Sequence, residues 1–289
     1  MEIQFGCKLP SDDIVVLERG EATRVVIHLH GATVLSWTHN GVEQLFVSSK
    51  SVFDNKKAIR GGIPIVFPHF GPWPLGPQHG FARIKRWTVA QPPKQDETGA
   101  VLATLTLRDD EETRKMWKAE FELVYTVQLH ENSLRCVLAV HNTGHANIDF
   151  TCLLHTYLRV PDIKDTRVLG LRGVTYIDKV KDGKEFAEDR EYVTVAENYD
   201  RIYKNAPQTV FVQTGAHQRL EMTTSNLPDV VVWNPWKDKS REMADFDDDG
   251  WRYMLCVEAG KVVSPVVLEA GAAFECSVSF TVNPEHHGL

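Results

Sequence analysis

Two residues of the sequence have the types that acid–base chemistry requires and lie in strand-like surroundings. His155 alternates with Leu153 and Tyr157 along residues 151–159, and Glu258 ends an apolar stretch at residues 253–260. A histidine exchanges a proton near neutral pH, and a carboxyl group whose pKa is raised by burial can serve as a general base. Each has a structural alternative. A lone histidine on a strand is more often a hydrogen-bonded structural residue, and the carboxylate can instead bind loop amides.

The least regular segment spans residues 58–87 and holds five of the 14 prolines together with five of the 19 glycines. Such a segment cannot form a regular ladder, because proline lacks the N–H donor and glycine weakens strands. Long ordered loops often carry function. Arg60, His79 and Arg83 are costly to bury beside the neighbouring apolar residues unless something pairs with them. A structural cover over a sheet edge is the alternative interpretation.

Two further clusters allow more than one interpretation. The rings of Trp233 and Trp236 can stack on a sugar or anchor a loop. His28 and His30 share one strand face and form a possible metal pair, but no carboxylate follows at close spacing, which favours a structural or solvated pair. The sequence lacks the phosphate-loop, dinucleotide-binding, nucleophile-elbow and His-Glu-x-x-His motifs.

A period of two dominates the elements that would position these residues. Residues 121–129 and 134–140 alternate cleanly, and Asn132-Ser133 between them predicts a hairpin. Residues 109–118 are the best helix candidate. Many strands separated by turn residues predict an all-β fold, a large antiparallel sandwich or barrel, and the lack of a linker predicts one domain over 1–289. Further short strands are expected at residues 14–19, 24–29, 33–37, 101–107, 148–160, 209–213, 230–233, 253–257 and 274–280.

The composition excludes several classes. With 32 basic and 39 acidic residues, the net charge is −7, which argues against broad nucleic-acid binding. No run of 18 apolar residues and no secretory signal is evident, so we expect no membrane partner. The five cysteines form no C-x-x-C pair, and a cytoplasmic location is the expectation.

Taken together, the motifs resemble the hexose-phosphate mutarotase family, the glucose-6-phosphate 1-epimerases, which are related to the aldose 1-epimerases. The resemblance implies a large β-sandwich of the galactose-mutarotase type and the interconversion of α and β anomers. The matching segments occur in the family's order and are Ile59–Pro68, His79–Arg83, Leu154–Tyr157, Asp200–Tyr203, Trp233–Trp236, Met243–Asp245 and Cys256–Glu258.

The resemblance also implies residue roles. Glu258 is the base and His155 the acid, and His79 hydrogen-bonds near the reacting end of the sugar. Asp200 contacts a sugar hydroxyl or orients an arginine, Gln78 assists a hydroxyl, and Trp233 and Trp236 wall the pocket. Opening and closing a sugar ring requires proton transfer alone, so no cofactor and no metal are expected.

A phosphorylated substrate needs local cations in this acidic protein. The resemblance assigns Arg60 and Arg83 to the phosphate, and arginine forks suit phosphate oxygens. If residues 81–87 are extended, Arg83 and Lys85 share one face, which adds Lys85 to the set.

Three alternatives remain at this stage: an aldose 1-epimerase for unphosphorylated sugars, a noncatalytic carbohydrate-binding or sensory module, and, remotely, a metal-dependent sandwich enzyme. A monomer is expected.

Overall fold

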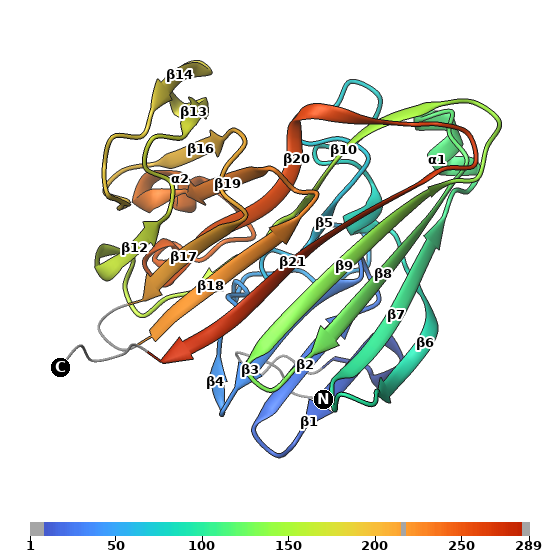
Figure 1. Cartoon of the computed structure of the whole chain (residues 1–289), viewed down its shortest axis with the longest axis horizontal. Helices are drawn as coiled ribbons and strands as arrows, with labels where there is room; N and C mark the ends of the chain where they lie inside the picture. The colour runs from blue at the N-terminus through green and yellow to red at the C-terminus, as the bar shows by residue number, and fades with distance from the viewer. Residues whose placement is uncertain (1–8, 215–217, 285–289) are drawn as a thin grey trace.

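The computed structural model describes residues 9–214 and 218–284, in which antiparallel strands predominate (Figure 1). A small sheet has the order β1 (Ile14–Arg19), β2 (Thr23–His28), β3 (Thr33–His39) and β4 (Val42–Glu43). The largest sheet has the order β15 (Tyr192–Val193), β12 (Thr166–Leu169), β17 (Thr209–Thr214), β18 (Gln218–Ser225), β21 (Ala273–Pro284), β9 (Ser133–Asn142), β8 (Phe121–Leu129), β7 (Val101–Arg108) and β6 (Thr88–Gln95).

The third sheet, which we call the site sheet, carries the candidate catalytic residues. Its order is β14 (Lys184–Ala187), β13 (Thr175–Asp178), β16 (Tyr199–Tyr203), β19 (Asp229–Asn234), β20 (Met254–Leu268), β10 (Ile148–Leu154) and β5 (Ile65–Val66), and β11 (Tyr157–Arg159) also pairs with β20. In Figure 1 the long strands β21, β9, β8 and β7 lie in front of β5 and β10. The all-β sandwich prediction is confirmed.

The period-two pattern explains the largest sheet. In β8, every odd position from Phe121 to Leu129 is buried while the even positions are partly exposed, and β8 pairs with β9 in the predicted hairpin. Alternate side chains of a strand point to opposite faces, so this pattern covers one face of the sheet with apolar groups. The buried face packs into the main hydrophobic core.

The proline- and glycine-rich segment is anchored in that core by aromatic residues. The Phe67 ring lies 6.2 Å from Phe81, 5.4 Å from Phe121 and 5.2 Å from Phe150 between centroids. Gly80 has φ +72°, and a Cβ there would lie 2.1 Å from the Phe67 carbonyl oxygen, so only glycine permits this approach. The segment is therefore held rigidly although it contains little regular structure.

The helical elements are short. In the part of the chain that the structure describes they are α1 (Glu111–Met116), α2 (Trp236–Glu242) and the 3-10 turns η2 (Ser11–Asp13), η3 (Ala82–Ile84), η4 (Ile163–Asp165), η5 (Lys179–Lys181) and η6 (Gly250–Tyr253). The predicted helix at 109–118 corresponds to α1, which begins with a capping box between Asp110 and Thr113. Helix α2 was not predicted from the spacing, because its exposed, charged sequence carries no apolar stripe. Among the described residues, no helix has the length and apolar character that crossing a membrane requires.

Candidate active site

The register of the site sheet brings the two predicted acid–base residues together. Leu154 pairs with Ala259 and Tyr157 pairs with Cys256, so the same antiparallel register sets His155 opposite Glu258. Residues directly opposite each other on antiparallel strands have neighbouring side chains on one face. His155 Nδ1 accordingly lies 3.2 Å from Glu258 Oε1.

A second row of the same sheet adds an aromatic and an acidic group. Tyr157, Cys256, Trp233 and Asp200 follow one another across β11, β20, β19 and β16. The Tyr157 ring stacks on His155 at 4.7 Å, and Trp233 meets His155 edge-on at 6.1 Å. These contacts fix the plane of the imidazole beside Glu258.

His155 and Glu258 of the first row and Trp233 and Asp200 of the second line the floor of a cavity of about 240 Å³. Its walls come from the proline-rich segment, from η5 and from the region of α2. The lining residues are Arg60, Phe70, Gln78, His79, His155, Lys179, Asp200, Val231, Trp233, Lys239, Met243 and Glu258. The structure thus gathers Arg60, Gln78, His79, His155, Asp200, Trp233 and Glu258, seven of the nine predicted site residues, in one cavity.

The His155–Glu258 pair is buried and poorly satisfied. The two residues are 7% and 1% exposed, and His155 Nδ1 and Glu258 Oε2 have no hydrogen-bond partner among the described residues. Although Nδ1 and Oε1 are close, their alignment is not that of a hydrogen bond. Burial, followed by the charge of Asp200, raises the pKa of Glu258 well above its ordinary value. Burial, followed by His79 and Arg83, lowers the pKa of His155.

His79 adds a neutral imidazole to the cavity wall. Burial, followed by the charge of Arg83, lowers its pKa to about 3. The Gly71 N–H donates to His79 Nδ1 at 3.1 Å, so the neutral ring carries its proton on Nε2. Nε2 lies 3.3 Å from Gln78 Nε2, which is also a donor, so in this tautomer the two nitrogens are neighbours and not hydrogen-bond partners. His79 therefore presents a hydrogen-bond donor at the cavity beside Gln78.

Arg60 is the best-positioned cation of the predicted set. Its Nε donates to Asp245 Oδ2 at 3.2 Å, and Nη1 donates to the Tyr157 hydroxyl at 3.3 Å. Since Tyr157 stacks on His155, Arg60 is connected to the catalytic pair through one side chain. A guanidinium group whose orientation is fixed by two hydrogen-bond partners is pre-organised to bind an anion.

Arg83 is not among the lining residues but contacts one of them. Its Nη2 donates to the Gln78 carbonyl oxygen at 2.8 Å, and its Nε has no hydrogen-bond partner among the described residues. Burial lowers the pKa of Arg83 to about 10, so it remains cationic at neutral pH. Its charge therefore supports an anion next to Gln78.

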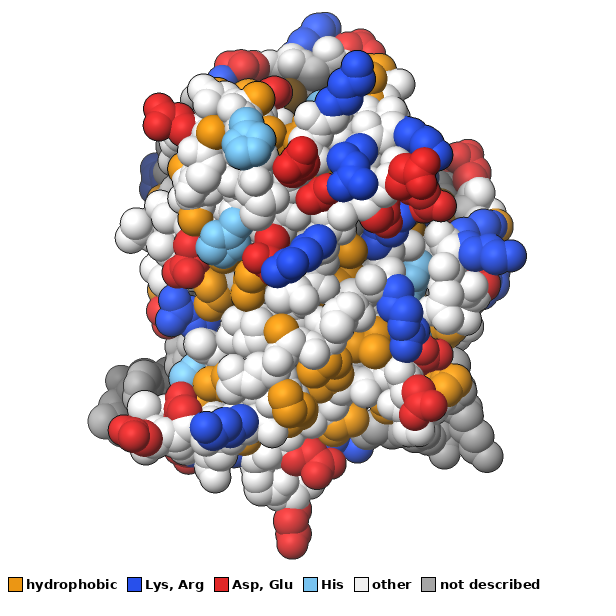
Figure 2. All heavy atoms as spheres, turned by 90° about the vertical axis from the view of Figure 1, so that its right-hand side faces the viewer, with side chains coloured by type: hydrophobic (Ala, Val, Ile, Leu, Met, Phe, Trp, Pro, Cys, Tyr) orange, Lys and Arg blue, Asp and Glu red, His pale blue; other side chains and the backbone are white. Residues whose placement is uncertain are grey.

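The prediction for Lys85 is wrong. The segment is not extended there, because η3 at Ala82–Ile84 turns the chain and removes the shared face with Arg83. Lys85 Nζ instead contacts Asp110 at 2.8 Å and Glu112 at 2.6 Å, beside α1. The side of the molecule that includes β6, β7 and α1 carries interspersed acidic and basic side chains (Figure 2), and Lys85 takes part in such pairing.

Two lysines of the cavity escaped sequence reasoning. Lys179 begins η5, and its Nζ lies 3.4 Å from Asp200 Oδ2; Lys239 lies on α2. The only local signal was the turn-forming Asp182-Gly183 after Lys179. Asp200 was predicted to contact a sugar hydroxyl or orient an arginine, whereas its ion-pair partner is this lysine.

The remaining candidates lie outside the cavity lining. His30 N–H donates to His28 Nδ1 at 3.0 Å, and His30 Nε2 lies 2.8 Å from the Lys57 carbonyl oxygen, as expected of a structural pair. Trp236 packs against Trp251 with ring centroids 4.3 Å apart, so it anchors a loop.

Comparison with known proteins identifies relatives of the chain. The chain is 36% identical over 289 residues to a protein of Cenchrus ciliaris named "Putative glucose-6-phosphate 1-epimerase", covering 97% of this chain and 88% of that protein. A protein of the same name from Escherichia coli K12 is 34% identical over 255 residues, covering 87% and 84%.

The fold has solved counterparts as well. The crystal structure of a "putative mutarotase" from Salmonella typhimurium superposes with a TM-score of 0.87 at 29% identity, covering 96% of this chain and 92% of that one. The profile of the aldose 1-epimerase family matches residues 13–281, and with these relatives it shows that the chain belongs to the aldose 1-epimerase family.

Proposed function

We propose that the chain interconverts the α and β anomers of a hexose 6-phosphate, with glucose 6-phosphate as the preferred substrate. The observation that supports this most strongly is the opposed, buried pair of His155 and Glu258 in a cavity that also contains Arg60, Lys179 and Lys239. An acid–base pair suits ring opening, and clustered cations suit a phosphate.

The reaction uses one proton shared by the pair. Burial favours its residence on Glu258. When the proton resides on His155 instead, the pair consists of a carboxylate and an imidazolium. The negative charge of a phosphate in the cavity favours that charged form of His155. Because the two groups are coupled, their titration belongs to the pair rather than to either residue.

Glu258 then accepts the proton of the C1 hydroxyl while the bond between C1 and the ring oxygen breaks. The electrons of that bond move to the ring oxygen, which takes the proton of His155, and C1 becomes an aldehyde. Rotation about C1–C2 exposes the other face of the aldehyde. Closure reverses both proton transfers, so the enzyme is unchanged, and each transfer is typically worth ~10²–10⁴-fold in rate.

The sugar phosphate also restricts where the phosphate can lie. Its phosphorus is separated from the ring oxygen only by C5, C6 and one oxygen, so the phosphate must lie near the acid. Arg60 satisfies this requirement through Tyr157, which stacks on His155. We propose Arg60 and Arg83 as the phosphate cations, with Lys179 and Lys239 adding positive charge across the cavity and Trp233 as a wall for the sugar ring.

The test is exchange NMR on the anomers of glucose 6-phosphate and of glucose. We expect Glu258→Gln and His155→Asn to abolish most of the enzyme-dependent exchange. Arg60→Ala should raise KM for glucose 6-phosphate by ~10–100-fold, the equivalent of one or more hydrogen bonds to a charged group, with little effect on glucose. Arg135→Ala, an exposed arginine on β9, is the control. Equal rates on both sugars would favour an aldose 1-epimerase, and sugar binding without exchange would favour a noncatalytic module.

We also propose that the chain is one domain and acts as a monomer in the cytoplasm. One hydrophobic cluster includes residues from Val15 to Phe280, which supports a single cooperative unfolding transition in calorimetry. Four cysteines of the described residues are buried and free, as suits a reducing compartment. Light scattering of the purified protein tests the monomer, and cell fractionation tests the location.

A further inference from the structure

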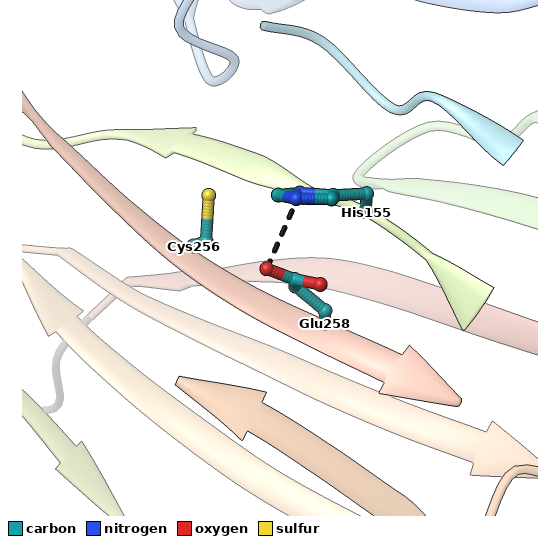
Figure 3. Close-up of side chains that lie close together, drawn as sticks. All are labelled: His155, Cys256 and Glu258. Atoms are coloured by element: carbon teal, nitrogen blue, oxygen red, sulfur yellow. Dashed lines mark ion pairs between the residues drawn. The ribbon is translucent and has the colours of Figure 1, made fainter. Parts of the chain in front are cut away.

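A thiol lies beside the catalytic pair and has no part in the proposed reaction. Cys256 is fully buried, and its Sγ, one donor atom of His155 and one carboxylate oxygen of Glu258 all lie within 4.8 Å of one another. Figure 3 shows Cys256 and Glu258 extending from the same strand, with the His155 ring close to the carboxylate. Histidine, cysteine and glutamate are all ligands of zinc.

The sheet register explains why the three donors converge. Cys256 and Glu258 are two residues apart on β20, so their side chains share one face. His155 is opposite Glu258 in the register set by its neighbours, which makes Cys256 its diagonal neighbour. Two of the donors thus come from one strand of the sheet, and His155 lies in the two-residue break between β10 and β11.

Two of the donors have free lone pairs. His155 Nδ1 and Glu258 Oε2 are buried and have no hydrogen-bond partner among the residues 9–214 and 218–284. Unpaired polar atoms in a protein interior are unfavourable, and a ligand that binds them removes this penalty. Both atoms belong to residues that line the cavity, which provides a route of entry.

The spacing suits a tetrahedral cation. With bond lengths of about 2.0–2.3 Å to zinc, the donors of such a site are about 3.3–3.6 Å apart. The 3.2 Å between His155 Nδ1 and Glu258 Oε1 already matches one edge. The thiol would need to move by about 1.5 Å at most to complete a third position, as in zinc sites with three protein ligands.

We propose that His155, Cys256 and Glu258 form a binding site for Zn²⁺, and that its occupation inhibits the epimerase. The inhibitory part rests on the proposed function. Zinc would occupy the lone pairs with which Glu258 and His155 exchange protons, so the bound cation and the reaction exclude each other. Binding displaces the thiol proton and the proton shared by the pair into solvent, so the affinity should rise with pH.

The binding test uses the metal alone, without sugar. The purified protein is treated with a chelator, freed of it, and titrated with Zn²⁺ by calorimetry and with Co²⁺ by absorption spectroscopy. We expect one site with a thiolate-to-cobalt charge-transfer band, which surface histidines cannot produce. Cys256→Ala should lose the band and at least ~10–100-fold in affinity, the loss that even an outer-shell partner of a metal site produces. Cys136→Ala, a buried cysteine on β9, should keep both.

The inhibition test measures anomer exchange of glucose 6-phosphate with Zn²⁺ and then with excess chelator. We expect reversible inhibition of the wild type and much weaker inhibition of Cys256→Ala relative to its own metal-free rate. Identical metal binding by Cys256→Ala and wild type, or no thiolate band, would overturn the site. Activation by zinc would overturn the inhibitory role. A chelated wild type without any exchange activity would instead disprove the proposed function and leave the binding result standing.

Discussion

Two buried glutamates of the site sheet and its margin have opposite environments. Glu188, which is 2% exposed, accepts hydrogen bonds from Arg190 at 2.7 and 2.8 Å and from the Tyr203 hydroxyl at 2.9 Å. Glu258, which is 1% exposed, has no comparable donor, and its Oε2 is unpartnered among the described residues. Burial alone therefore does not distinguish a structural carboxylate from a reactive one.

The pKa directions follow from this contrast. Burial acts to raise the pKa of Glu188, but the hydrogen bonds from Arg190 and Tyr203 overcome it and lower the pKa. Burial raises the pKa of Glu258, and Asp200 adds to the shift. A satisfied buried carboxylate stays ionised and holds structure, whereas an unsatisfied one is ready to exchange a proton.

The residues around Glu188 also support the cavity from outside. Arg201 Nη1 lies 3.8 Å from Glu188 Oε2. Arg201, next to Asp200 on β16, donates to Asp178 Oδ2 at 3.0 Å. The other oxygen of Asp178 accepts from the Val180 and Lys181 N–H groups at 3.0 and 3.2 Å, which caps η5. The satisfied region therefore positions Lys179 and Asp200, while the unsatisfied region is left for chemistry.

The largest expected effect separates the two glutamates by activity. Glu258→Gln should lower kcat for anomer exchange by ~10²–10⁴-fold, because the base is removed while the shape is kept. Glu188→Gln should leave kcat per folded molecule within a few-fold of wild type. Exchange NMR measures both, with Glu97→Gln, an exposed turn residue, as the control. A similar loss in both buried variants would remove the functional half of the comparison.

The free energy of unfolding should distinguish the two variants in the opposite way, because here Glu188→Gln should be the more damaging substitution. Glu188→Gln weakens the charged hydrogen bonds with Arg190, whose side chain is 38% exposed, and should lower the free energy of unfolding by about 1–3 kcal/mol. Glu258→Gln removes an unsatisfied carboxyl group and should raise it by about 0.5–2 kcal/mol, as expected when an active site carries a stability cost. Denaturant unfolding at neutral pH measures both changes, and destabilisation by Glu258→Gln would contradict the assignment.

The pH dependence sharpens the same comparison. The folded-state pKa of Glu258 is raised, so its ionisation opposes folding; this penalty is absent below the unfolded pKa, near the ordinary value of 4.5, and grows as pH rises. The folded-state pKa of Glu188 is lowered, so its stabilisation is present above the unfolded pKa and is lost as pH falls. On acidification, the stabilisation by Glu258→Gln and the destabilisation by Glu188→Gln, each relative to wild type, should therefore both become smaller. Thermal unfolding from about pH 2 to about pH 8, which spans the ordinary glutamate pKa and the lowered pKa of Glu188, checks this directly.

The smallest expected effect concerns two cations. Lys85→Ala should change KM for glucose 6-phosphate less than twofold, because its partners Asp110 and Glu112 lie at α1. Stability should fall by no more than about 1 kcal/mol, since such surface pairs contribute little. A steady-state comparison with Arg60→Ala is the measurement, and a rise in KM for Lys85→Ala as large as that for Arg60→Ala would restore Lys85 to the phosphate site.

Several features followed from local pattern. The alternation of Phe121–Leu129 was sufficient to predict β8 and its hairpin partner, because a period of two has one structural meaning when it is sustained. The parity of His155 with Tyr157 correctly indicated a shared face. The prediction that Lys85 shares a face with Arg83 failed because alternate residues share a face only in an extended segment, and η3 interrupts the extended backbone there.

The amino-acid sequence by itself determined the strand-rich character of the chain, the family to which it belongs and the residue types available for proton transfer. Only the tertiary structure decided that His155 faces Glu258, because that contact depends on a register between segments about a hundred residues apart. Folding likewise decided which of the two buried glutamates is reactive. Glu188 and Glu258 are the same residue type, and the difference between them comes from the hydrogen-bond donors that folding places around each carboxylate.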